Sequence, residues 1–295
     1  MTEKPLVSVI INCYNGEKYL REAIDSVIAQ TYENWEMVFW DNQSTDSTRE
    51  IVENYKNSKI KYFYAPEHTS LGEGRNNALM EVIGDYVCFL DSDDVWHNSF
   101  LNETVAVLEA NKRVGLAYSG YQYIGAKKGV HRSGKIGIRN LTSLLEEYDI
   151  ALSGAVFKRS IQKNNSIYFD TSFNLIEDLD FFTKLCSIEP AFRLEAPLLY
   201  YRIHSNNLSR KTTNWYSEYL RFYNRIKDER TDDANYPKGV VAIKKRMLNA
   251  RFTDSYNAND SFVVSFKYAL AAQPIVMKFV YIKALLIRKL SRTMK

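Results

Sequence analysis

The sequence contains few of the residues that cross-link or interrupt a fold. It has 3 cysteines, 6 prolines and 12 glycines among 295 residues, and Cys13, Cys88 and Cys186 lie far apart inside apolar runs. Scattered cysteines in odd number are typical of a reducing compartment and argue against a disulfide framework or a cysteine-ligated metal site. With 45% hydrophobic and 25% charged residues, the composition excludes collagen-like, low-complexity and disordered chains. We therefore expect a folded protein with an ordinary hydrophobic core.

Long hydrophobic runs are also missing. A membrane-spanning helix needs about 20 mostly apolar residues, and the most hydrophobic stretch of this chain is interrupted by Gln273, Pro274, Lys278 and Lys283. The first five residues carry no basic cluster, and no hydrophobic segment of signal-peptide length follows them. The sequence therefore predicts no transmembrane helix, no secretory signal and a cytoplasmic location.

Charge is distributed unevenly along the chain. The formal net charge is +4, yet from Lys238 onward there are 12 lysine and arginine residues against 2 aspartates. The remainder is consequently acidic, and the two parts are expected to meet different partners. Near the C-terminus, apolar residues are interspersed with Lys278, Lys283, Arg288, Lys289, Arg292 and Lys295. A helix of that kind can lie on the inner face of the plasma membrane, or dock on the rest of the chain or another subunit. The acidic body argues against nucleic acid as a partner.

The first 125 residues alternate between strand-like and helix-like segments. Apolar runs predict strands, and apolar residues at helical spacing between them predict helices. The expected strands are Val7–Ile11, Trp35–Trp40, Ile60–Tyr64 and Tyr86–Leu90, and the expected helices are Tyr19–Ile28, Ser44–Tyr55 and Leu71–Val82. This order requires an α/β fold with a mostly parallel, Rossmann-like sheet covered by helices on both faces.

Beyond residue 125 the alternation weakens. We expect a glycine- and lysine-rich loop, a mixture of strands and helices, and a helical C-terminal extension. These segments are a loop at Lys127–Gly137, a helix at Leu141–Tyr148, strands at Ala151–Phe157 and Ala191–Ile203 around a helix from Glu177, and helices over 209–230 and 238–295. The chain accordingly divides into residues 1–125, 126–208 and 209–295.

Polar residues are concentrated where the predicted strands end. The segments are Asn12–Asn15, Asp41-Asn42 and Asp91–Asp94. Open parallel sheets bind ligands at the carboxyl ends of their strands. We therefore expect these residues to line one ligand site.

Asp91 and Asp93 directly follow the fourth predicted strand. Two carboxylates close together hold Mg²⁺ or Mn²⁺ when a further anionic ligand, such as a diphosphate, completes the oxygen shell. The alternative is an acidic cap for a helix expected near Asn98, and Asp178-Leu179-Asp180 repeats the same pattern. Placement at a strand end favours the metal interpretation. The histidines at 68, 97 and 131 suggest no zinc site and are expected at the surface.

Asp41 and Tyr14 lie on neighbouring loops of the predicted sheet. An aspartate at this place can accept the imide N–H of a uracil, while a tyrosine ring offers a face for the base. The alternatives are a turn residue that bonds its own backbone and a half-buried aromatic side chain. The residues alone leave both interpretations open.

Several segments together resemble one family. They are Val7–Asn15 with Ser26–Thr31, Asp41–Asp46, Leu90–Asp94, Gly72 with Arg75-Asn76, Ile176–Asp178 and Tyr201–His204. In order, spacing and residue type they resemble the GT-A glycosyltransferases of family 2, of the inverting, bacterial polysaccharide type, over roughly residues 5–210. The resemblance implies a GT-A fold and transfer of a sugar from a nucleoside-diphosphate sugar, for which we expect a UDP-sugar.

The resemblance also implies roles for individual residues. It assigns donor binding to Tyr14, Asn15, Glu17, Asp41, Arg75 and Asp91, a divalent metal (Mn²⁺ or Mg²⁺) to Asp93 and His204, and the catalytic base to Asp178. A structural histidine is the alternative for His204. Gln43 departs from the pattern, because the family more often has glycine or Asp-Gly there. This departure bears on how closely the backbone approaches the donor beside Asp41.

The chemistry of transfer agrees with these assignments. A leaving diphosphate needs its charge neutralised, which a divalent metal does, and an acceptor hydroxyl needs its proton removed, which a carboxylate does. Asp178 suits the second task, although Glu177, Asp178 and Asp180 are equally explained as favourable charges in the first turn of a helix. No residue stands out as a covalent nucleophile, so a single displacement with inversion is expected.

Other functions are less well supported. A nucleotidyltransferase should have a glycine-rich basic loop where this chain has Cys13–Glu17, and a haloacid-dehalogenase-like phosphatase should have an aspartate in place of Asn12. Gly72–Arg75 lacks the third glycine of a dinucleotide fingerprint. A catalytically degenerate sugar-nucleotide-binding protein stays open. The expected partners are a nucleotide-sugar donor and a saccharide or lipid-linked saccharide acceptor in cell-surface glycan synthesis.

Overall fold

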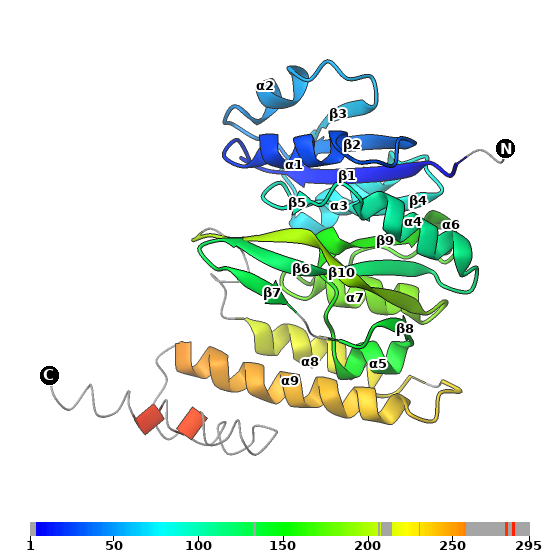
Figure 1. The fold of residues 1–295 in the computed structure, drawn as a ribbon. Helices are drawn as coiled ribbons and strands as arrows, with labels where there is room; N and C mark the ends of the chain where they lie inside the picture. Colours follow the sequence, from blue (N-terminus) through cyan, green and yellow to red (C-terminus); the bar gives the residue numbers. More distant parts are fainter. Residues whose placement is uncertain are drawn as a thin grey trace, which may run out of the picture. The chain divides into compact units, whose positions relative to one another are not determined.

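The computed structural model describes residues 4–131, 134–205, 207, 214–229, 231–257, 281–282 and 285–286. The chain forms two compact units. Residues 1–141 with 148–205 make the first unit, and residues 142–147 with 206–295 make the second. The first unit contains a ten-stranded sheet and helices, which confirms the predicted α/β class (Figure 1).

One half of the sheet is parallel. β1 (Val7–Cys13) lies between β2 (Trp35–Asp41) and β4 (Tyr86–Phe89), and β3 (Ile60–Tyr64) lies at the edge beyond β2. All three pairs are parallel, so Cys13 lies opposite Asp41 where both strands end. The connections between these strands contain helices that cover both faces, which is why β1 is buried along nearly its whole length.

The other half of the sheet is mixed. From β4 the order continues through β9 (Ala155–Lys158), β6 (Leu116–Gly125) and β10 (Ala191–Ile203) to β5 (Val95–Trp96). β9 is antiparallel to both of its neighbours, whereas β6 and β10 are parallel to each other. β10 is antiparallel to β5. Because β5 follows the acidic turn after β4, this pairing brings the end of β10 beside that turn.

Helices of the first unit cover the sheet from both sides (Figure 1). They are α1 (Leu20–Ile28), α2 (Thr48–Glu53), α3 (Leu71–Met80), α4 (Phe100–Ala110), α6 (Arg159–Asn164) and α7 (Glu177–Cys186). Ile11 of β1 packs in one cluster with Ile24 of α1 and Leu101 of α4. On the opposite face, Phe89 of β4 contacts Phe181 of α7, with ring centroids 6.3 Å apart.

The second unit is helical. α8 (Trp215–Ile226) and α9 (Tyr236–Asn257) pack against each other, and most of α5 (Leu141–Glu146) belongs to the same unit. Phe222 and Ile243 are fully buried, and the Tyr236 hydroxyl donates to the Ile226 carbonyl at 3.2 Å. Among the described residues, no helix combines the length and the apolar composition needed to span a bilayer.

Some predicted boundaries were wrong. The predicted loop at 127–137 contains strand β7 (Gly129–His131) and leads into β8 (Gly137–Arg139). Gly129 and Gly137 have φ values of 124° and 97°, which glycine adopts readily, and β7 and β8 pair back onto β6 and β10. The strand predicted from Ala151 begins at Ala155, after a 3₁₀ turn.

The predicted helices are longer than those observed. Those expected to reach Val82 and Tyr148 end at Met80 and Glu146, and the one expected from Ser44 begins at Thr48. The helix predicted over 209–230 corresponds to α8, and α9 accounts for the prediction beyond 238 as far as residue 257. The six cations of the C-terminal segment, from Lys278 to Lys295, lie outside the described residues.

The packing beneath α7 leads to a first prediction. Phe181 is fully buried against Phe89, Phe157 and Phe169. Phe181→Ala removes these contacts and leaves a cavity, so we expect the free energy of unfolding to fall by about 3–5 kcal/mol, as measured by urea denaturation. Ile188→Ala, at a side chain that is 52% exposed, should change it by less than about 0.5 kcal/mol. Equal losses in the two variants would contradict this description of the core.

Candidate active site

The loop after β1 is tied to the loop after β2 by hydrogen bonds. The Asn15 amide donates to Ser44 Oγ at 2.9 Å, and Asn15 Oδ1 accepts from the Thr45 amide at 2.8 Å. Glu17 accepts from the Ser47 amide at 3.0 Å. Asn15 has a left-handed backbone with φ of 53°, which asparagine tolerates better than most residues. Asn15 and Glu17 therefore shape these loops, and their contact with a donor stays a prediction.

Tyr14 is the exposed aromatic residue of the same loop. Its side chain is 52% exposed, and its ring centroid lies 4.4 Å from that of His68. His68 Nδ1 is 2.8 Å from the carbonyl oxygen of Asn42, which makes Nδ1 the protonated nitrogen. This bond fixes the imidazole beside Tyr14. No sequence pattern pointed to His68 as part of the site, because the contact depends on two loops that meet only in the fold.

Asp41 ends β2 and is fully buried. One carboxylate oxygen accepts from the Ser44 amide and the other from the Tyr62 hydroxyl, each at 2.7 Å. The first bond is the one expected of a turn residue. Each oxygen keeps a second lone pair that can accept a further N–H. Recognition of a base by Asp41 therefore stays a prediction.

Gln43 occupies the place where the family more often has glycine. Its φ is 68°, so the left-handed conformation that favours glycine is retained. The side-chain amide donates to the carbonyls of Ala65 and Pro66 at 3.3 and 2.8 Å. These bonds connect the loops after β2 and β3 and offset the backbone strain. The departure from the family pattern thus leaves the turn beside Asp41 in place.

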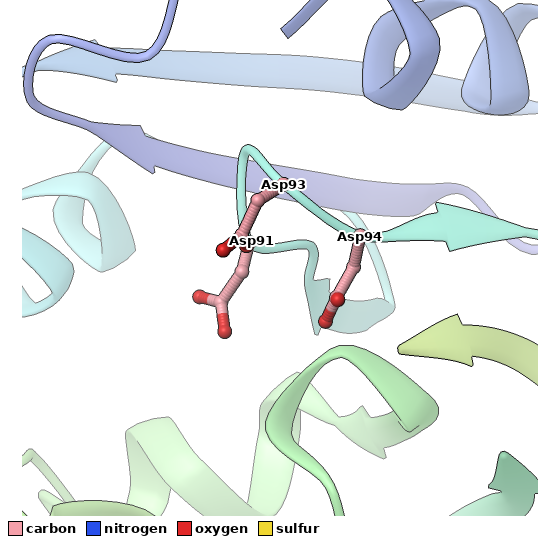
Figure 2. A group of neighbouring side chains, drawn as sticks. All are labelled: Asp91, Asp93 and Asp94. Atoms are coloured by element: carbon pink, nitrogen blue, oxygen red, sulfur yellow. The ribbon is translucent and has the colours of Figure 1, made fainter. Parts of the chain in front are cut away.

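An acidic cluster follows β4, formed by Asp91, Asp93 and Asp94 (Figure 2). Ligand atoms of the three side chains lie within 4.8 Å of one another. Asp94 is 2% exposed, and its Oδ2 makes no hydrogen bond within the described part of the chain. Burial first, and then the charge of neighbouring carboxylates, raises the pKa of Asp93 and of Asp94. A divalent cation would relieve this repulsion, and carboxylate oxygens are ligands that Mg²⁺ and Mn²⁺ prefer.

Residues at and just after the end of β10 contact this acidic cluster. His204 Nε2 lies 2.8 Å from Asp93 Oδ2. The Arg202 amide donates to Asp94 Oδ1 at 2.9 Å, and Arg202 Nε donates to the Asp93 carbonyl at 2.8 Å. The structure thus brings together Asp93 and His204, the two residues predicted to hold a metal. Asp94 and Arg202 were not assigned a role from the sequence, since only the pairing of β10 with β5 places them there.

Arg75 joins the acidic cluster to helix α7. Its side chain is buried, and it donates to Asp91 Oδ1 at 3.0 Å and to Glu177 Oε1 at 2.8 Å. The charges of these two carboxylates outweigh burial and raise the pKa of Arg75. The structure therefore gives Arg75 a positioning contact that the sequence did not predict. Its contact with a donor stays a prediction.

Asp178 shares the first turn of α7 with two other acids. Glu177 pairs with Arg75, and Asp180 pairs with Lys184 at 2.7 Å, whereas Asp178 forms no ion pair with any described residue. Burial, followed by the charge of Glu177, raises the pKa of Asp178 to about 7. A carboxyl group with this pKa can exchange a proton near neutral pH, which is what a general base requires.

Comparison with known proteins decides the family. A sequence profile described as "Glycosyl transferase family 2" matches residues 8–175, more than half of the chain. The chain belongs to this family. The resemblance seen in the sequence is thereby confirmed, and the protein is a glycosyltransferase.

Curated bacterial relatives agree with this assignment. The Escherichia coli UDP-Glc:alpha-D-GlcNAc-diphosphoundecaprenol beta-1,3-glucosyltransferase WfaP is 30% identical over 228 residues, which cover 75% of this chain and 86% of WfaP. Bacillus subtilis TuaG, named for teichuronic acid biosynthesis, is 37% identical over 120 residues, which cover 40% of this chain and 47% of TuaG. The match therefore spans about half the length of that relative.

Solved structures share the predicted GT-A fold. Residues 1–349 of Staphylococcus aureus TarS in complex with UDP match with a TM-score of 0.73 at 22% identity, over 89% of this chain and 78% of that one. The Pyrobaculum calidifontis mannosyltransferase PcManGT in complex with GDP-Man and Mn²⁺ matches with a TM-score of 0.66 at 18% identity, over 100% and 82% of the two chains. The mostly parallel sheet expected from the sequence is thus the one found in these glycosyltransferases.

The buried contacts of Arg75 generate a second prediction. Arg75→Met removes the guanidinium and leaves two carboxylates without it, so we expect the free energy of unfolding to fall by about 3–5 kcal/mol in urea denaturation. Arg49→Met is the matched control, because Arg49 also pairs with a glutamate but its side chain is 64% exposed. Loss of such a surface pair should cost about 1 kcal/mol or less. A small effect at both positions would show that the Arg75 bridge does not hold the site together.

Proposed function

We propose that this glycosyltransferase moves a sugar from a UDP-sugar to a hydroxyl of a saccharide or lipid-linked saccharide, with inversion, in cell-surface glycan synthesis. The observation that carries this proposal is that the first unit contains both groups that the reaction needs. One is an acidic cluster with His204 beside Asp93, and the other is a separate carboxyl group, Asp178, whose pKa is about 7. WfaP supports the donor and the acceptor class by its name. TarS structures in complex with UDP and UDP-GlcNAc support the donor further.

Donor binding is assigned to the loops at the carboxyl ends of β1, β2 and β4. Tyr14 offers an exposed ring for the base, and Asp41 offers a carboxylate to its imide N–H. Asp91 would approach the ribose from the acidic cluster, held in place by Arg75. Asn15 and Glu17 keep the first of these loops in position through their hydrogen bonds to the second.

A divalent cation, Mn²⁺ or Mg²⁺, fits the acidic cluster. Asp93 and His204 would hold it, with Asp91 and Asp94 adjacent. When bound, it supplies positive charge against the departing diphosphate. Arg202 would fix this arrangement, because it bonds both the Asp93 carbonyl and Asp94 from the end of β10.

Asp178 is proposed as the general base. The acceptor oxygen forms a bond to the anomeric carbon while the bond from that carbon to the diphosphate oxygen breaks, and the hydroxyl proton passes to the Asp178 carboxylate. The nucleoside diphosphate leaves with the bonding electrons. One displacement of this kind inverts the anomeric centre.

The acceptor and the place of action are proposals that follow from the relatives and from the charge distribution. A lipid-linked acceptor would place the protein at the inner face of the cytoplasmic membrane. In this scheme residues 1–125 bind the donor, residues 126–208 bind the acceptor, and residues 209–295 form the helical basic region.

The role of Asp178 generates a third prediction. Asp178→Asn should lower kcat by about 10²- to 10⁴-fold, because an amide cannot take the proton. In the wild type, kcat/KM should rise with pH up to about 7 and then level off, since the base acts only when ionised. Asp228→Asn, at a side chain that is 82% exposed, is the control and should leave both measurements unchanged. A flat pH profile combined with an active Asp178→Asn variant would remove Asp178 from the mechanism.

The metal and the donor base are tested together in a fourth prediction. We expect UDP with Mn²⁺ or Mg²⁺ to raise the melting temperature, GDP and dTDP to raise it less, and EDTA to abolish the rise. Asp93→Ala should lose the metal-dependent part. Stabilisation that is unchanged by EDTA would contradict the metal assignment.

Product analysis of the reaction separates sugar transfer, which releases a nucleoside diphosphate, from nucleotidyl transfer, which releases pyrophosphate.

A further inference from the structure

The second unit has a cationic cleft along α9, beside the end of α5. The cleft has a volume of about 720 Å³. Its cations are Lys238, Lys245 and Arg246, and Glu146 of α5 is its acid. Lys244 does not line the cleft but is exposed on the flank of the helix, one turn after Val241. From residue 236 to residue 253 the chain contains no aspartate or glutamate, so this face of the helix carries charge of one sign.

Helical spacing explains how the cations gather. Positions 238, 241, 242, 245, 246 and 249 recur at three- and four-residue intervals and lie on one face of α9. Tyr236, Ile243 and Met247 lie on another face and are buried. The helix is therefore anchored through one side and presents the other.

The presented face also carries apolar side chains. Val241 is 50% exposed, and Pro237 lies beside it in the cleft. Arg246 donates to the carbonyls of Leu145 and Glu146 at 3.0 Å each, which fixes its guanidinium at the end of α5. Lys244 and Lys245 form no ion pair with the described residues, so their charge is available to a partner.

We propose that this face of α9 binds the surface of an anionic phospholipid bilayer. Lys238 and Lys245 lie on one side of the helix and can reach a layer of phosphates together, Lys244 flanks them one turn from Val241, and the exposed apolar residues between them can enter the headgroup region. A soluble polyanion would use the lysines but would gain little from Val241 and Pro237. The inference deepens the proposed function, because a lipid-linked acceptor lies in the same surface.

Vesicle co-sedimentation of the full chain tests the proposal. We expect the wild type to bind vesicles of phosphatidylcholine in which about one lipid in three is the anionic phosphatidylglycerol. It should not bind vesicles of phosphatidylcholine alone. Each lysine near an anionic surface contributes about fivefold to binding, so the triple variant Lys238→Gln/Lys244→Gln/Lys245→Gln should bind about 100-fold more weakly. Raised salt should weaken wild-type binding as well.

A matched control removes the same charge elsewhere. Lys112, Lys128 and Lys163 are exposed residues of the first unit, and their replacement by glutamine should leave vesicle binding within about fivefold of the wild type. Equal binding by the wild type and the α9 triple variant would overturn the proposal, as would a wild type that ignores anionic vesicles. Hydrolysis of the UDP-sugar without vesicles, measured on the same variants, reports the proposed function separately and should not change.

Discussion

The candidate site depends on a buried guanidinium between two carboxylates. Arg75 contacts Asp91 at the end of β4 and Glu177 at the start of α7, so one side chain joins the segment proposed to bind the donor to the segment that carries the proposed base. Removing carboxylates from water is costly unless a cation and hydrogen bonds compensate. Arg75 provides that compensation on one side of the acidic cluster, and Arg202 and His204 provide it on the other. The fold places these three residues, from α3, from β10 and from the position directly after β10, around a turn of four residues.

Much of the first unit could be predicted because its signals are local. The apolar runs of β1 to β4 and the helical spacing between them determine a parallel sheet, and residues that follow parallel strands must meet at one edge. Asp41, Asp91 and Asp93 could therefore be placed at that edge from the sequence alone. The pairing of Asp93 with His204 could be anticipated only through the family resemblance, because 110 residues of chain separate the two.

The remainder depends on contacts that no local pattern encodes. β7 and β8 are three residues each and form only because β6 and β10 offer them edges. The position of His68 beside Tyr14 follows from a hydrogen bond to the Asn42 carbonyl. Gln43 keeps a backbone conformation suited to glycine because its own amide bonds the next loop. In each case a tertiary hydrogen bond, rather than the residue's intrinsic preference, decides the structure.

The first turn of α7 shows why residue type alone cannot assign a role. Glu177, Asp178 and Asp180 all favour a helix N-terminus equally well, and the sequence leaves them equivalent. The fold pairs two of them with cations, Arg75 and Lys184, whereas Asp178 forms no ion pair within the part of the chain that the structure describes, and burial and the charge of Glu177 raise its pKa. Burial raises the pKa of Glu177 as well, but its ion pair with Arg75 opposes this rise and fixes the carboxylate in place, whereas burial beside a like charge makes Asp178 ready to accept a proton. The surroundings of Asp178 thus favour it as the proposed base, and the nearby charge of Glu177 contributes to its raised pKa.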